Sequence, residues 1–320
     1  MNIDKKLQLD MYEMMFRIRS FEMKARELFL NGKLPGFLHL YPGEEAVATG
    51  VCANLTPTDQ ICSTHRGHGH CIAKGGETKK MMAELYAKTT GYCQGKGGSM
   101  HIADPDLGIL GANGIVGAGM PIAVGAAFAM KYRKTKDVTV VFFGDGASNR
   151  GTFHEALNMA SLYNLPVIFV CENNEVAMYT RQQYHQKIKD VSKRAVGYDI
   201  EGFTYDGNDV LAVYEAAKTA VEKARNNGGP TLLEFKTWRH LGHTLGDKEK
   251  YRTAEEKEEW LKKDPIPRFE AYLQDSKIAA KKELEAIRDK VAVEIDEAVQ
   301  FGIDSPHPAL SDLTVGVYAD

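Results

Sequence analysis

Hydrophobic and polar positions follow two different patterns along the chain, and each pattern predicts a different element. Residues 7–30 carry apolar side chains at the spacing of an amphipathic helix, and the dipeptide NG that follows supplies a stop. Residues 138–143 (VTVVFF) and 166–171 (PVIFVC) are short, continuous apolar runs, which are typical of buried strands. Between them, residues 147–164 form a loop and an amphipathic helix. This order predicts two parallel strands joined by a crossover helix.

The alternation continues with a helix near residues 210–224 and a strand at residues 231–238. It predicts an α/β fold with a doubly wound, mostly parallel sheet flanked by helices. We expect one domain over residues 1–320, with a helical N-terminal part at residues 1–55 and a helical C-terminal extension at residues 253–320.

A further helix is expected at residues 43–53, with Glu44 and Glu45 in its first turn. Carboxylates at this position are favoured by the positive end of the helix dipole. Stabilisation of the helix end is therefore the interpretation of both acids.

The composition is that of an ordinary soluble globular protein, with 43% hydrophobic residues, 26% charged residues and a formal net charge of −3. The chain lacks the excess of basic residues that would indicate nucleic-acid binding. The first twenty residues lack the apolar core of a signal peptide, and no later run is long enough to span a bilayer. Five cysteines without paired spacing suit reduced thiols. We therefore expect a cytoplasmic protein.

Polar residues follow both predicted strands directly. The first strand runs into GDG around Asp145, and the second runs into ENN, which ends at Asn174. Ligands in parallel sheets bind outside the carboxyl ends of the strands, so these side chains are expected to share one crevice. A carboxylate and an amide oxygen suit Mg²⁺, which completes its shell with phosphate oxygens. The pairing predicts a metal together with a diphosphate.

Other phosphate motifs do not match. Residues 91–98 (GYCQGKGG) lack the Ser or Thr and the glycine spacing of a P-loop. The sequence GDGASNRG lacks the third glycine of a dinucleotide-binding turn, which disfavours a nicotinamide cofactor. The long glycine-rich segment at residues 91–119 is expected to be a functional loop.

The stretch HRGHGHC, residues 65–71, allows either a zinc site or an anion site. Zinc is disfavoured, because the intervening glycines leave no helix or strand to fix the ligand geometry and no second ligand cluster follows. For His68, His70 and His101, structural and active-site roles both remain open.

Three segments together resemble a known family: GYCQGKGGSMHIADPDLGILGANGIVGAG, FFGDGASNRGTFHEALNMASLYNLPVIFVCENN and TWRHLGHTLGD. They are similar to the alpha subunit of the thiamine-diphosphate-dependent first (decarboxylating) component of 2-oxo acid dehydrogenase complexes. The resemblance covers nearly the whole chain, and it is strongest to the acetoin dehydrogenase alpha subunits of that family. It implies the thiamine-diphosphate-binding fold.

The resemblance also implies roles for individual residues. Asp145 and Asn174 would bind Mg²⁺, with the backbone carbonyl of Val176 as a third protein ligand. His243 would act as a catalytic residue on a mobile loop, and His65, where relatives usually have Tyr, would be a second one. The implied cofactor-binding residues are Arg66 at the diphosphate, Gly114 and Val116 at the aminopyrimidine, Gly144, Gly146 and Ala147 near the diphosphate, and Arg239 and His243.

The activity that the resemblance implies is cleavage of acetoin to acetaldehyde and a cofactor-bound two-carbon unit, which passes to a lipoyl-bearing dihydrolipoyl acyltransferase. Oxidative decarboxylation of pyruvate or of a branched-chain 2-oxo acid is the alternative. The family needs a glutamate from a separate beta subunit, so two alpha and two beta chains are expected to form a heterotetramer. A non-catalytic paralogue is disfavoured, because the residues assigned to the metal, diphosphate and substrate are present.

Overall fold

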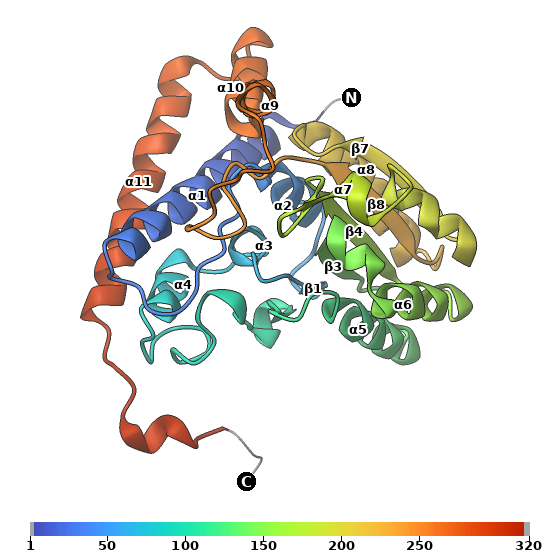
Figure 1. Ribbon diagram of the computed structural model, residues 1–320, viewed down its shortest axis with the longest axis horizontal. Helices are drawn as coiled ribbons and strands as arrows, with labels where there is room; N and C mark the ends of the chain where they lie inside the picture. The colour runs from blue at the N-terminus through green and yellow to red at the C-terminus, as the bar shows by residue number, and fades with distance from the viewer. Residues whose placement is uncertain (1–2, 317–320) are drawn as a thin grey trace.

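A six-stranded sheet in the order β2-β1-β3-β4-β8-β7 organises the computed structural model, which describes residues 3–316 (Figure 1). All neighbouring strands pair in parallel. This arrangement confirms the predicted α/β fold class. The strands are β1 (Gln60–Cys62), β2 (Ile109–Gly111), β3 (Thr139–Gly144), β4 (Val167–Asn173), β7 (Glu201–Asp206) and β8 (Thr231–Lys236). A separate short hairpin joins β5 (Val176–Ala177) to β6 (Thr180–Arg181).

Strands β3 and β4 lie side by side, as the two apolar runs predict. Their register begins with Thr139 opposite Val167 and ends with Gly144 opposite Glu172. Successive side chains of a strand point to opposite faces, so Phe142 enters one core and its neighbour Phe143 enters the other. Each strand is a continuous apolar run because both of its faces are buried.

Helices cover both faces of the sheet. One core contains residues of α1 (Lys5–Leu30), α2 (Glu45–Cys52) and α8 (Val210–Arg225), and the other contains residues of α5 (Gly119–Arg133) and α6 (Gly151–Leu162). Helices α1, α2, α6 and α8 match the expected ones to within a few residues. None of the described helices is long and apolar enough to cross a membrane.

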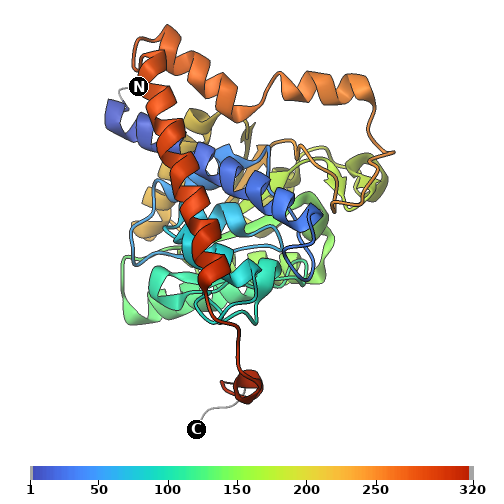
Figure 2. The same cartoon turned by 90° about the vertical axis from the view of Figure 1, so that its left-hand side faces the viewer.

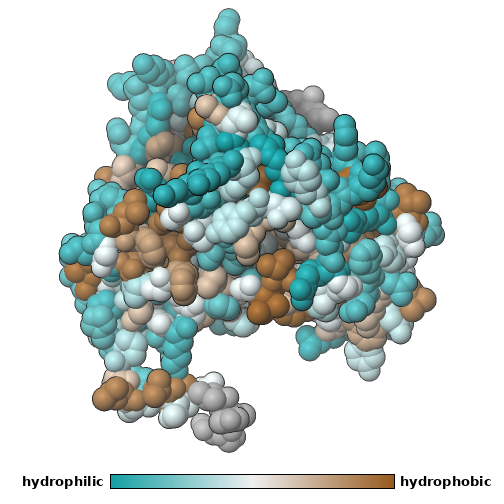
Figure 3. Space-filling view, viewed as in Figure 1, coloured by the Kyte–Doolittle hydropathy of each residue, from teal (hydrophilic) through white to brown (hydrophobic). Residues whose placement is uncertain are grey.

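The long helix α11 (Lys281–Asp304) packs against α1 and α4 (Thr78–Leu85) rather than against the sheet (Figure 2). It follows α9 (Ala254–Leu261) and α10 (Pro265–Asp275). Beyond it, residues 305–316 form an arm that stands away from the body of the molecule (Figures 1 and 2). Apolar side chains gather on this arm (Figure 3), including Leu310, which is 95% exposed.

The histidine-rich stretch differs from the expectation, because its second half is helical. Helix α3 (His68–Ala73) begins directly after Gly67. His68 and His70 are fully buried, and each ring is held by a buried carboxylate, Glu22 for His68 and Glu172 for His70. Tertiary packing of these rings stabilises a helix that the local glycines do not favour.

A buried carboxylate organises the start of the glycine-rich segment. Glu84 on α4 is fully buried, and its two oxygens accept hydrogen bonds from four backbone amides at 2.8–2.9 Å. The donors are Cys93, Gly95, Gly97 and Gly98. Gly91 also touches this side chain, since a Cβ there would lie 2.4 Å from Glu84 Oε2. The loop is therefore built around a single charged acceptor.

Replacing this acceptor should destabilise the protein. We expect Glu84→Ala to lower the free energy of unfolding by about 3 kcal/mol or more, because several buried amides lose a charged partner. Urea unfolding followed by circular dichroism would measure the change. Glu77→Ala at the start of the same helix removes only surface ion pairs with Lys79 and Lys80, so its cost should stay below about 1 kcal/mol. Equal midpoints for the two variants would contradict this role of Glu84.

Candidate functional site

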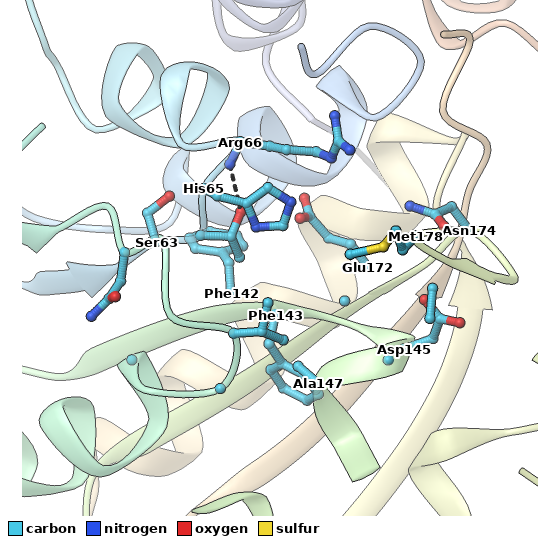
Figure 4. A pocket seen from close by; sticks show the side chains of 18 of the residues that line it. Ser63, His65, Arg66, Phe142, Phe143, Asp145, Ala147, Glu172, Asn174 and Met178 are labelled. Carbon is cyan, nitrogen blue, oxygen red and sulfur yellow. Dashed lines mark hydrogen bonds between the residues drawn. The ribbon is translucent and has the colours of Figure 1, made fainter. Parts of the chain in front are cut away.

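A cavity of about 250 Å³ lies at the carboxyl ends of β3 and β4 (Figure 4). Its wall combines residues from the ends of these strands with the histidine-rich stretch, the loop before α5 and the loop after β8. The structure thus brings together most residues that the sequence assigns to the site. The assigned residues in the wall are His65, Arg66, Val116, Gly144, Asp145, Gly146, Ala147, Asn174, Val176, Arg239 and His243.

Asp145 and Asn174 both line this cavity, as expected from the strand order. They are 2% and 7% exposed, and Figure 4 shows both at the same end of the cavity. The β5 residue Val176 lies two positions after Asn174, and its amide donates to Asn174 Oδ1 at 3.3 Å. The donor set is composed of oxygens, which are the ligands that Mg²⁺ prefers.

The residues beside Asp145 begin a short 3-10 turn, Asp145–Asn149. Gly146 is required by close packing within the protein, because a Cβ there would lie 2.6 Å from the Cβ of Ala177. Gly144, by contrast, has room for a Cβ, whose nearest contact would be Glu172 O at 3.9 Å. Packing against Ala177 is therefore enough to require glycine at position 146.

Gly114 is not in the cavity wall, although its neighbours Asn113 and Ile115 are. It faces His101 instead, since a Cβ at Gly114 would lie 3.1 Å from His101 Nε2. Val116, which does line the cavity, is 46% exposed.

Two buried guanidinium groups face the cavity. Arg66 is 5% exposed and Arg239 is 2% exposed. Arg66 donates to the carbonyl oxygens of Leu40 and His243, and Arg239 donates to the carbonyl oxygen of Leu241, each at 2.8–2.9 Å. Within residues 3–316, neither forms an ion pair with a carboxylate. Burial and the charge of Arg239 lower the pKa of Arg66 to about 9.

Three imidazoles lie together beside these arginines. The ring centroids are 5.0 Å apart for His39 and His65, 5.3 Å for His39 and His243, and 5.8 Å for His65 and His243. Arg66 Nη2 lies 3.0 Å from His243 Nδ1. A guanidinium can only donate, so Nδ1 is the acceptor and the proton of the neutral ring lies on Nε2. His65 Nε2 is buried without a hydrogen-bond partner in the described chain.

All three histidines are held in the neutral form. Burial, with a further contribution from Arg66, lowers the pKa of His39 and of His243 to about 4. The same two causes place the pKa of His65 still further below its usual range. The cluster therefore offers neutral hydrogen-bonding groups at pH 7 rather than additional cations.

Sequence reasoning missed three residues of this site: His39, Glu44 and Glu172. Glu44 and Glu172 line the cavity and are 1% and 5% exposed. Burial and the nearby Glu172 charge raise the pKa of Glu44 to about 8. The helix-end interpretation of Glu44 is wrong, since its side chain makes no capping hydrogen bond and instead accepts from Asn174 Nδ2. Glu45 pairs with Arg19 and with the amide of Gly43.

The remaining histidines of the predicted stretch have structural partners. His68 joins Glu22 to Ser99 on the glycine-rich segment, and His70 joins Glu172 to Ser63. Tyr41 also donates to Glu172. Among the residues that the structure describes, no group of three or more His, Cys, Asp or Glu side chains has metal-binding geometry.

Comparison with known proteins gives a consistent result over nearly the whole chain. Residues 13–311 match the family described as the dehydrogenase E1 component. The chain is 53% identical to the alpha subunit of acetoin:2,6-dichlorophenolindophenol oxidoreductase from Bacillus subtilis, covering 99% of this chain and 95% of the relative. Identity to the subunit of the same name from Cupriavidus necator is 47%, again over 99% of this chain and 95% of the relative. A chloroplastic pyruvate dehydrogenase E1 component subunit alpha-3 from Arabidopsis thaliana is 43% identical, over 99% of this chain and 76% of the relative.

The lowered histidine pKa values predict a loss of stability in mild acid. Between pH 6.5 and 4 the unfolded chain binds protons at His39 and His243, whereas the folded chain does not. The free energy of unfolding should therefore decrease as the pH falls through this window. Urea unfolding at pH 7 and pH 5, without added thiamine diphosphate, would measure the decrease. His39→Gln should make it smaller, and replacement of the exposed His101 by Gln should not. An unchanged decrease in the His39 variant would contradict the assignment.

Proposed function

The chain belongs to the dehydrogenase E1 component family, and from this premise we propose that it is the alpha subunit of a thiamine-diphosphate-dependent oxidoreductase that cleaves acetoin. One observation carries the proposal. Two buried guanidinium groups without carboxylate partners lie in the same cavity wall as Asp145 and Asn174. A buried cation of this kind needs an anion, and a diphosphate is the anion that this family binds.

The residues present fit the diphosphate. Arg66 and Arg239 are planar, multiply donating groups whose remaining N–H groups can bind phosphate oxygens with charge-assisted hydrogen bonds. Their existing bonds to backbone carbonyls fix the orientation of both side chains. We propose that Arg66 binds the diphosphate, and that the amides of Gly146 and Ala147 lie close to it.

The residues also fit Mg²⁺. Asp145, Asn174 and the carbonyl of Val176 would supply three oxygen ligands, and phosphate oxygens or water would complete the shell. Without a cation, the Asp145 carboxylate would repel a nearby diphosphate. The metal and the diphosphate are therefore expected to bind together.

When bound, thiamine diphosphate supplies the nucleophilic carbon that attacks a substrate carbonyl and accepts the electron pair of the broken C–C bond. The protein contributes position and hydrogen bonding. His243 lines the cavity in the neutral form with its proton on Nε2, so it can donate a hydrogen bond to a substrate oxygen. We propose His243 and His65 as the catalytic residues that this chain contributes, with Val116 and Gly114 beside the aminopyrimidine.

A second subunit is expected to complete the cavity. The Bacillus subtilis and Cupriavidus necator relatives are named as alpha subunits. Apolar residues at the cavity wall remain open to solvent, with Ile115 65% and Met178 55% exposed, and hydrophobic residues gather near the middle of the face in Figure 3. We propose that a beta subunit covers this rim in a heterotetramer of two alpha and two beta chains. The two-carbon unit would then pass to a lipoyl-bearing dihydrolipoyl acyltransferase.

We also propose a cytoplasmic location. All five cysteines are free thiols, and four of them are buried. Their reduced state suits a reducing compartment.

Acetoin is the proposed substrate because the acetoin-related subunits share more identity with this chain than the pyruvate dehydrogenase subunit from Arabidopsis thaliana. The test is co-expression with a beta-type chain, followed by reduction of 2,6-dichlorophenolindophenol with acetoin or pyruvate in the presence of thiamine diphosphate and Mg²⁺. We expect acetoin-dependent reduction. Pyruvate-only activity would overturn the substrate and keep the reaction class. No activity despite bound cofactor would favour a branched-chain substrate or a non-catalytic protein, and full activity of the single chain would contradict the two-subunit site.

Two variants should separate cofactor binding from turnover. Asp145→Ala removes the charged metal ligand, so calorimetry on the assembled protein should show no binding of thiamine diphosphate with Mg²⁺. His243→Ala should retain binding and lose about 100-fold or more in kcat, the usual contribution of a positioned proton donor. His154→Ala on the exposed face of α6 serves as the control for loss of an imidazole. Equal loss of binding in both test variants would make His243 a cofactor ligand instead.

A further inference from the structure

Each proposed side-chain ligand of the metal is held by a second side chain from another part of the fold. Glu44 Oε1 accepts a hydrogen bond from Asn174 Nδ2 at 3.1 Å. His185 Nε2 lies 3.2 Å from Asp145 Oδ2. Neither contact is needed to form the sheet or to end a helix, so a different role must explain them.

The Glu44 contact fixes the orientation of an amide. Glu44 Oε1 is the acceptor in this contact, so Glu44 binds the NH₂ end of Asn174 and leaves Asn174 Oδ1 on the other side. That oxygen is turned toward the amide of Val176, the residue whose carbonyl is the proposed third ligand. Glu44 is 1% exposed, and a buried acid held this closely by the amide restrains its rotation. Without it, the two ends of the amide could exchange places.

The His185 contact fixes a carboxylate in a similar way. His185 ends the short helix α7 (Gln182–His185), and its Nδ1 lies 2.9 Å from Asn149 Nδ2. An amide NH₂ can only donate, so Nδ1 is the acceptor and the ring proton lies on Nε2. His185 Nε2 therefore donates to Asp145 Oδ2, and Oδ1 remains for a cation. Asn149 closes the 3-10 turn that begins at Asp145, so the arrangement ties both ends of this turn together.

We propose that Glu44 and His185 are positioning residues that orient Asn174 and Asp145 for the metal that accompanies the diphosphate. The inference rests on the proposed function, because it takes a divalent cation as the ligand of these two side chains. Partners of metal ligands orient the ligands before binding, and their loss typically lowers metal affinity by about 10-fold to 100-fold. Glu44 directly precedes α2 and His185 ends α7, so the two ligands are aligned by segments outside β3 and β4.

The test is the affinity of the assembled protein for Mn²⁺ in the presence of thiamine diphosphate, measured from free Mn²⁺ by electron paramagnetic resonance. We expect Glu44→Ala and His185→Ala each to weaken Mn²⁺ binding by about 10-fold or more. Glu44→Gln retains a carbonyl acceptor for Asn174 and should bind close to wild type. Glu175→Ala is the matched control, since this exposed carboxylate lies beside Asn174 in sequence and its side chain makes no hydrogen bond to the described residues.

The outcomes separate the inference from the function on which it rests. If the wild-type protein binds Mn²⁺ and both Ala variants bind it with the same affinity, the positioning role is overturned and the proposed function is not. Equal weakening in Glu44→Gln and Glu44→Ala would show that charge rather than the hydrogen bond matters, and would also overturn it. No Mn²⁺ binding by the wild-type protein would overturn the proposed function. Thermal unfolding without metal and subunit assembly, measured for each variant, identify any variant that fails to fold.

Discussion

The burial of two arginines without carboxylate partners is the constraint on which the site depends. Each guanidinium loses most of its hydration, and within residues 3–316 it is compensated mainly by backbone carbonyls. Carbonyl dipoles offset only part of the cost of burying a cation. The two guanidinium groups therefore favour an anion, and burial together with the charge of Arg66 keeps the neighbouring histidines neutral.

The sheet and the ends of β3 and β4 could be predicted because they follow from local rules. Continuous apolar runs separated by an amphipathic helix have few interpretations other than parallel strands, and adjacent strands must end at the same edge. Asp145 and Asn174 could be paired for that reason. Strands β1 and β2 were not predicted, because three residues are too few for a pattern. Strand β7 lies at the edge of the sheet and is largely exposed, so its residues do not form an apolar run.

The parts of the site that could not be predicted depend on contacts between distant segments. Glu44 has the local sequence of a helix start, and only its packing against Asn174 distinguishes it from an ordinary first-turn acid. His39 belongs to no motif, and it packs against the cavity residues His65 and His243 from the chain before α2. Helix α3 forms because Glu22 and Glu172 bind its two histidines from separate elements, which no window of local sequence contains. A motif can identify the groups that contact a ligand, whereas the groups that orient them are chosen by the fold.

The carboxylate of Glu84 determines which backbone amides of the protein are available to an anionic ligand. Several backbone amides that converge on one point form a concave anion site, the arrangement called a nest. In the glycine-rich segment such a nest exists, and Glu84 fills it as a built-in anion. A phosphate could bind to these amides only by displacing the Glu84 carboxylate, which is part of the chain. At the ends of β3 and β4, by contrast, Arg66 and Arg239 form no ion pair with a carboxylate of the described residues. Because Glu84 occupies the amides of the glycine-rich segment, phosphate-bearing ligands are directed to the cavity that contains Arg66 and Arg239.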